Sequence, residues 1–173
     1  MERAVDNRQD DDYVDRLRDD FRVVYPDLDT ASIEVFGRIS RIGAQMSHLV
    51  DRALAPTGIS RAELEVLSAL VRSPRPLRAS EVISTTMLSG ASITKLADRL
   101  AGAGLLERQK FERDGRVVLL APTAAGRDLV ERELPLRLDR EWQLLDGFSA
   151  DEIRALTELL RRLSERVNAA DRR

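Results

Sequence analysis

Residues 89–104 read Ser-Gly-Ala-Ser-Ile-Thr-Lys-Leu-Ala-Asp-Arg-Leu-Ala-Gly-Ala-Gly, and this stretch predicts a short amphipathic helix. The side chains expected to face inward, spaced by three and four residues, are Ile93, Leu96, Ala97 and Leu100. Ser92, Lys95 and Arg99 then share the opposite face. A helix that enters the major groove of DNA needs small residues at its tip and a polar, cationic face. An ordinary helix with a solvated polar face has the same pattern, so both interpretations stay open.

The next segment predicts a β-hairpin. Residues 105–111 and 116–120 are rich in residues that favour strands, and Asp114-Gly115 between them is typical of a tight turn. Arg113 and Arg116 flank this turn. An arginine at a projecting tip can enter a narrow minor groove, where the negative potential is strongest. The alternative is a surface hairpin that is kept soluble by its charges.

Further helices are expected on both sides. A capping box of Ser60 and Glu63 begins one short helix, and residues 79–85 predict a second. Longer amphipathic segments lie in residues 13–54 and 123–167, and Pro135 should kink the helix that contains it. Together these helices carry more apolar surface than the compact segment of residues 60–121 can cover. The pattern therefore predicts a partner, most simply a second copy of the chain.

The composition excludes several classes of function. The chain of 173 residues has no cysteine, which removes disulfides, thiolate metal sites and cysteine nucleophiles. With His48 as its single histidine, it has little material for a histidine zinc site or a Ser-His-Asp triad. No grouping of nucleophile, base and orienting residue is visible. The sequence therefore predicts a protein that is not an enzyme and has no cofactor or metal site.

The charge is unevenly distributed. The net charge is −2, yet residues 72–116 hold nine Lys or Arg against five Asp or Glu. A basic block in an acidic chain predicts a surface that faces phosphates. No apolar run approaches the roughly 18 residues of a membrane span, and the acidic N-terminus is unlike a secretory signal. We therefore expect a cytoplasmic location and no membrane partner.

Taken together and in this order, these elements resemble the MarR family of bacterial transcriptional regulators. The resemblance covers residues 60–126. It is carried by Asp98-Arg99-Leu100 with Ala103-Gly104-Leu105, by Arg113-Asp114-Gly115-Arg116, and by Thr123-Ala124-Ala125-Gly126. The chain departs from the family pattern at Gly115, where an arginine is typical, and at Pro122, where a leucine is typical.

The resemblance implies a mainly α, winged helix-turn-helix fold with long N- and C-terminal dimerisation helices. The implied parts are an N-terminal extension with an added helix (1–28), a dimerisation helix (29–59), a DNA-binding lobe (60–121) and C-terminal dimerisation helices (122–173). Residues 89–103 would be the recognition helix. The implied DNA contacts are Ser89, Ser92, Thr94, Lys95, Arg99, Arg113 and Arg116. The implied function is sequence-specific binding of double-stranded DNA by a homodimer at a pseudo-palindromic operator, usually in repression, with release by a small ligand.

The N-terminal region resembles a branch of the family that has an extra helix and includes urate-responsive members. The four ligand positions of that branch correspond to Phe21, Glu65, Leu96 and Arg108, of which only Arg108 is retained unchanged. The loss of an arginine and an indole donor argues against urate and favours a small aromatic or carboxylate effector. The expected ligand pocket is Phe21, His48, Glu65 and Arg108, although a packed or interfacial position is the favoured explanation of His48.

Two other functions fit the sequence. One is a DNA-binding regulator that has no small-molecule ligand. The other is a helical dimer that acts through protein partners after its wing has lost its DNA function. Gly115 and the net charge of −2 are the features that favour this second alternative.

Overall fold

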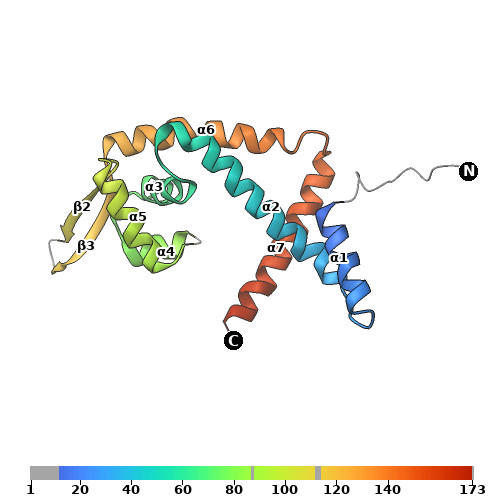
Figure 1. Cartoon of the computed structure of the whole chain (residues 1–173). Helices are drawn as coiled ribbons and strands as arrows, with labels where there is room; N and C mark the ends of the chain where they lie inside the picture. The colour runs from blue at the N-terminus through green and yellow to red at the C-terminus, as the bar shows by residue number, and fades with distance from the viewer. Residues whose placement is uncertain (1–11, 87, 112–113, 173) are drawn as a thin grey trace, which may run out of the picture. The chain divides into compact units, whose positions relative to one another are not determined.

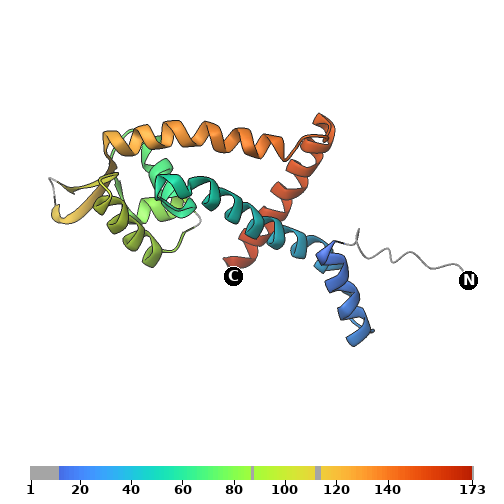
Figure 2. The same cartoon turned by 45° about the horizontal axis from the view of Figure 1, so that its top comes forward.

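The computed structural model describes residues 12–86, 88–111 and 114–172, with the backbone alone for 114–116. It divides into two compact units, which meet in the sequence between Glu63 and Leu64. Figures 1 and 2 show the elements of both units from two directions.

The first unit consists of helices. Helix α1 is Tyr13–Val24, α2 is Ala31–Leu54, and a 3-10 turn, η2, is Ala55–Thr57. The Asp29 carboxylate accepts a hydrogen bond from the Ala31 amide at 3.0 Å, whereas Thr30, the residue that directly precedes α2, makes no side-chain capping bond. Gly58 ends the turn with φ 75°, a left-handed conformation that glycine adopts without strain.

Helix α1 packs on α2 of its own chain. Val14 is fully buried and lies against Gly37, where an added Cβ would be 3.0 Å from Val14 Cγ1. Arg38 of α2 donates to Asp15 at 2.9 Å, and Glu34 accepts from both Arg18 and Arg38. These hydrogen bonds lower the pKa of the Asp15 and Glu34 carboxyls. A close apolar contact and a network of ion pairs thus hold the added N-terminal helix in place.

The second unit contains a small sheet among helices. After α3 (Arg61–Arg72), which crosses the boundary between the units, the elements are β1 (Leu77–Arg78), α4 (Ala79–Thr85), α5 (Gly90–Gly102), β2 (Leu106–Phe111), β3 (Asp114–Pro122), α6 (Ala124–Gln143) and α7 (Ala150–Asp171). In both views α5 lies beside α4, and the β2–β3 hairpin lies next to α5. This is a winged helix-turn-helix, and the predicted fold class is confirmed.

The sheet is antiparallel with the order β1-β3-β2. The expected turn at Asp114-Gly115 is wrong, because β3 already begins at Asp114, which pairs with Phe111. The register shifts between Lys110 and Phe111, and this shift extends the ladder past the position that the Asp-Gly pair suggested. Strand β1 is only two residues long, too short for the sequence to show an alternating pattern.

Apolar side chains from α3, α4, α5 and the hairpin form the core of the second unit. Deeply buried ones include Leu64, Val66, Leu67, Leu70, Val82, Ile93, Ala97, Leu100, Leu106 and Leu120. On α5 the predicted inward residues are buried, apart from Leu96, which is half-buried. Because these residues fix the rotation of α5, they decide which of its side chains face outward.

The two C-terminal helices expose much apolar surface. Helix α6 continues through Pro135, and the kink expected there stays a prediction. Helix α7 begins at the capping box of Ser149 and Glu152, and none of its residues is buried. Within the described part of the chain, none of the helices combines the length and the apolar composition that a membrane span requires.

Candidate DNA-binding surface

The outer face of α5 carries the polar residues that the sequence singled out. Thr94, Lys95 and Arg99 are exposed and Ser92 is half-buried, whereas Ile93, Ala97 and Leu100 of the same helix are buried. A hydroxyl, an ammonium and a guanidinium group therefore face outward within two turns of the helix. Such groups can donate hydrogen bonds to base edges and phosphates.

The two serines at the start of α5 interact with each other. Ser89 is the residue that precedes the helix, and its side chain makes no capping hydrogen bond to the first turn. Its Oγ lies 2.9 Å from the Oγ of Ser92. Two exposed or half-exposed hydroxyls at a helix N-terminus suit the binding of an anion, because the helix dipole is positive there.

The structure describes the side chains at the base of the wing but not those at its tip. Arg113 lies outside the described residues, and the side chain of Arg116 does as well, although the backbone of Arg116 belongs to β3. Their contacts with DNA stay predictions. Lys110, near the end of β2, is exposed and has no hydrogen bond or ion pair within the described part of the chain.

An ion pair joins α5 to the wing. Arg108 of β2 donates from Nη2 to Oδ1 of Asp98 on α5 at 2.6 Å. Both side chains are partly solvated, at 42% and 59% exposure, so an incoming anion can reach Arg108. An anion that displaces Asp98 from Arg108 would loosen the connection between the wing and α5.

The four residues of the expected ligand pocket lie on different units. Phe21 on α1 stacks on Tyr25 with 6.2 Å between ring centroids, and His48 on α2 is exposed. Glu65 is half-buried on α3, and Arg108 is paired as described above. A pocket shared by these residues stays a prediction.

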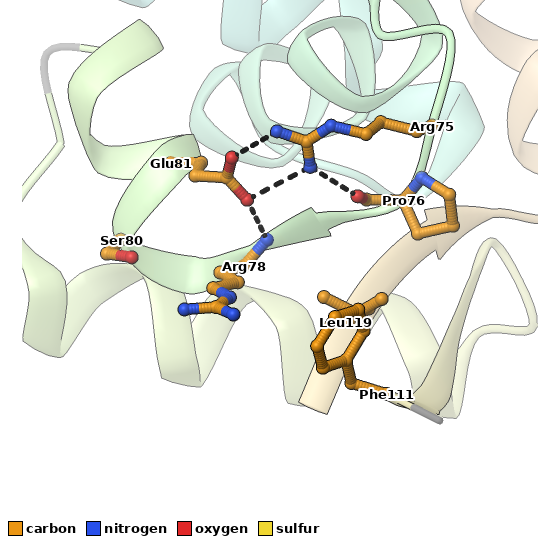
Figure 3. Close-up of a pocket in the computed structure, with 7 residues that line it drawn as sticks. All are labelled: Arg75, Pro76, Arg78, Ser80, Glu81, Phe111 and Leu119. Atoms are coloured by element: carbon orange, nitrogen blue, oxygen red, sulfur yellow. Dashed lines mark hydrogen bonds and ion pairs between the residues drawn. The ribbon is translucent and has the colours of Figure 1, made fainter. Parts of the chain in front are cut away.

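Sequence reasoning missed Arg78 and Phe111. The Arg78 guanidinium carbon lies 5.5 Å from the centroid of the Phe111 ring, in an open pocket between β1, α4 and the hairpin (Figure 3). The two residues are 33 positions apart, so no local pattern connects them. The one available signal was the basic excess of residues 72–116, to which Arg78 contributes.

Glu81 organises the start of α4 in the same pocket. Its carboxylate accepts a hydrogen bond from the Arg78 amide at 2.8 Å and also pairs with both terminal nitrogens of Arg75 (Figure 3). The Arg75 guanidinium, followed by the Arg78 amide, lowers the pKa of Glu81 to about 2. The charged carboxylate is therefore the form that stabilises this junction.

Replacing Glu81 by glutamine should destabilise the protein at neutral pH and have little effect in strong acid. Because the folded-state pKa lies below the ordinary value of 4.5, the stabilisation is complete above about 4.5 and is lost as the pH falls towards about 2. The effect should be modest, since the ion pair is exposed. Thermal unfolding of Glu81→Gln and the wild type, compared over this range by circular dichroism, measures it. A difference that does not change with pH would contradict this explanation.

The part of the chain that the structure describes contains no group of three or more Asp, Glu or His side chains arranged to hold a metal ion. The features that stand out are instead the cationic and hydroxyl groups on α5, the hairpin beside it and the basic junction at Arg78.

Comparisons with known proteins agree with this geometry. The sequence profile of the MarR family matches residues 57–117. The chain is 29% identical over 144 residues to the HTH-type transcriptional regulator PecS of Dickeya dadantii, covering 82% of this chain and 87% of PecS. It is 26% identical over 145 residues to the transcriptional repressor YetL of Bacillus subtilis, covering 83% and 87% respectively.

Solved structures of regulators of this kind also match the fold of this chain. The structure of Bordetella bronchiseptica BpsR, described as regulated in DNA binding by 6-hydroxynicotinic acid, matches with a TM-score of 0.67 and 25% identity over 76% of this chain and 98% of BpsR. The MepR–DNA complex of S. aureus matches with a TM-score of 0.71, 76% and 96% coverage and 19% identity, which supports the fold alone. In its winged helix-turn-helix, its motifs and these relatives, the chain is similar to the MarR family of transcriptional regulators, whose profile matches residues 57–117.

Proposed function

We propose that this protein is a sequence-specific DNA-binding transcriptional regulator that acts as a homodimer on a pseudo-palindromic operator. The observation that carries the proposal is the outer face of α5, where Thr94, Lys95 and Arg99 are exposed on a helix whose other face is buried in the lobe. Helices of this kind read base edges in the major groove.

Exposed apolar residues support the homodimer. Phe36 and Ile42 on α2, Trp142 on α6 and Leu159 on α7 are between 49% and 62% exposed in the single chain. Soluble proteins rarely leave such stripes in water, and a second copy is the simplest cover. A two-fold dimer would place two α5 helices about 34–36 Å apart, one turn of B-DNA, which requires an operator with two similar half-sites.

Repression and ligand release are supported by relatives and by one contact. YetL is named a repressor, and BpsR is described as regulated by an aromatic carboxylate. In this chain a small aromatic or carboxylate effector would compete with Asp98 for Arg108. The effector can release DNA only if it binds the DNA-free state more tightly than the bound state. The proposed location is the cytoplasm, where bacterial DNA is found.

The test is fluorescence anisotropy of the purified protein with labelled DNA from its own promoter region, at several salt concentrations and with excess non-specific competitor. We expect tight, salt-sensitive binding that competitor does not remove. Binding that competitor abolishes on every promoter fragment would contradict sequence-specific recognition. The same assay then serves to screen for effectors.

A ligand-independent regulator is the second candidate, because Asp98 already neutralises the one retained ligand arginine, Arg108. The two candidates differ in their response to small molecules. If no member of a panel of aromatic acids and purines raises the unfolding temperature or lowers DNA affinity, the second candidate is favoured.

A further inference from the structure

The pocket in Figure 3 contains two arginines in different situations. Arg75 is committed to the protein, because it pairs with Glu81 and donates to the Pro76 carbonyl oxygen at 3.0 Å. Arg78 is exposed, and its guanidinium makes no hydrogen bond or ion pair within the described part of the chain. Its guanidinium carbon lies over the face of the Phe111 ring, 5.5 Å from the ring centroid. The pocket thus offers one available cation.

The position of this cation follows from the strand register. Arg78 pairs through its backbone with Leu119 of β3, and its side chain reaches the ring of Phe111. Phe111 is the last residue of β2 and lies directly before residues 112–113, which connect the two strands of the wing in the sequence. The guanidinium therefore lies along the flank of the hairpin whose end is proposed to meet DNA.

The chemistry of the pocket suits an oxyanion next to an apolar surface. A guanidinium can stack its flat face on an aromatic ring and still donate N–H groups from its edge. Phosphate oxygens accept such bonds, often two at a time. The exposed Ser80 hydroxyl, which also lines the pocket, can donate a further bond. The stack on Phe111 limits the freedom of a long side chain and so lowers the entropy lost on binding.

We propose that Arg78 binds a backbone phosphate of DNA on the flank of the wing, with Phe111 as the platform that holds its guanidinium in place. This inference rests on the proposed function and adds to it a contact from outside the recognition helix and the wing tip. A phosphate contact strengthens binding and fixes the position of the protein on the duplex without reading the base sequence.

The test compares the full-length wild type with Arg78→Ala on an operator duplex and on an unrelated duplex of equal length, over a series of salt concentrations. We expect Arg78→Ala to weaken binding to both duplexes by a similar factor, roughly tenfold. We also expect it to flatten the plot of log affinity against log salt by about one unit per subunit. The ratio of the operator affinity to the affinity for the unrelated duplex should be the same in the variant and the wild type.

Two further variants separate the roles of charge and stacking. Phe111→Leu removes the ring but keeps the cation, so affinity should fall about two- to threefold with the salt slope unchanged. Arg162→Ala is the matched control, because it removes the same charge from an exposed position of α7. It should alter neither affinity nor slope. Circular dichroism establishes that each variant is folded.

Three outcomes would overturn the proposal. A salt slope for Arg78→Ala equal to that of the wild type would show that Arg78 does not contact phosphate. If the salt slope is unchanged, and if benzoate binds to the wild type but not to Arg78→Ala, the pocket binds a small aromatic anion and not a DNA phosphate. If the wild type binds no duplex in a salt-dependent way, the proposed function is itself wrong and this inference falls with it.

Discussion

Replacing Lys95 by glutamate should lower the affinity for operator DNA by roughly 100-fold or more. Lys95 is exposed on α5, and its ammonium has no hydrogen bond or ion pair within the described residues, so it is available to DNA. A good contact between a cationic side chain and a base edge contributes about 1–3 kcal/mol. A homodimer loses two such contacts, and a total of about 3 kcal/mol corresponds to roughly 100-fold. The new carboxylates would also repel the phosphates.

Fluorescence anisotropy with operator DNA measures this loss. Arg162→Glu on α7 is the control, because it changes the net charge by the same amount at an exposed position away from the leucine stripe. If both variants lose the same affinity, the effect comes from overall charge and not from the recognition helix. If Lys95→Glu binds like the wild type, α5 is not the element that reads DNA.

Replacing Gly126 by alanine should lower the unfolding temperature by about 6–12 °C. A Cβ at this buried position would lie 2.1 Å from the backbone oxygen of Leu105, and a backbone atom has little freedom to move away. Overpacking of this kind costs about 3 kcal/mol, and each kcal/mol shifts the midpoint of a protein of this size by about 2–4 °C.

Nearby hydrogen bonds prevent the structure from relaxing around the added methyl group. The Leu105 carbonyl accepts from the Thr123 amide at 3.1 Å, and the Thr123 hydroxyl donates to the Gly104 carbonyl at 2.8 Å. The same hydroxyl accepts from the Gly126 amide at 3.1 Å and so begins α6. Moving Leu105 away would disturb the junction of α5, β2 and α6.

Thermal unfolding by circular dichroism at one protein concentration checks the prediction, since dimerisation makes the midpoint depend on concentration. Gly102→Ala is the control. Gly102 lies at the exposed end of α5 with no other atom within 4 Å of an added Cβ, and alanine favours a helix more than glycine does. An unfolding temperature of Gly126→Ala equal to that of the wild type would contradict the close packing at this junction.

The sequence by itself determined the elements whose signals are local. The leucine and isoleucine spacing in residues 89–104 predicted both the helix and its buried face, because the period of a helix places residues three and four positions apart on the same face. The capping box of Ser60 and Glu63 marked the start of α3 for the same reason, and both of its hydrogen bonds are present, at 2.7 and 3.3 Å. The motif at residues 123–126 supported the family, although the sequence could not explain why it ends in glycine.

Only the tertiary structure decided the features that depend on how elements pack. The register shift after Lys110 moved the start of β3 to Asp114, against the local preference of Asp-Gly for a turn. Arg108 meets Asp98, and Arg78 meets Phe111, across separate elements. The requirement for Gly126 comes from a carbonyl group 21 residues earlier in the chain. Such contacts cannot be predicted from a periodic pattern in the sequence. They depend on how whole elements pack together and not on the spacing of residues along one element.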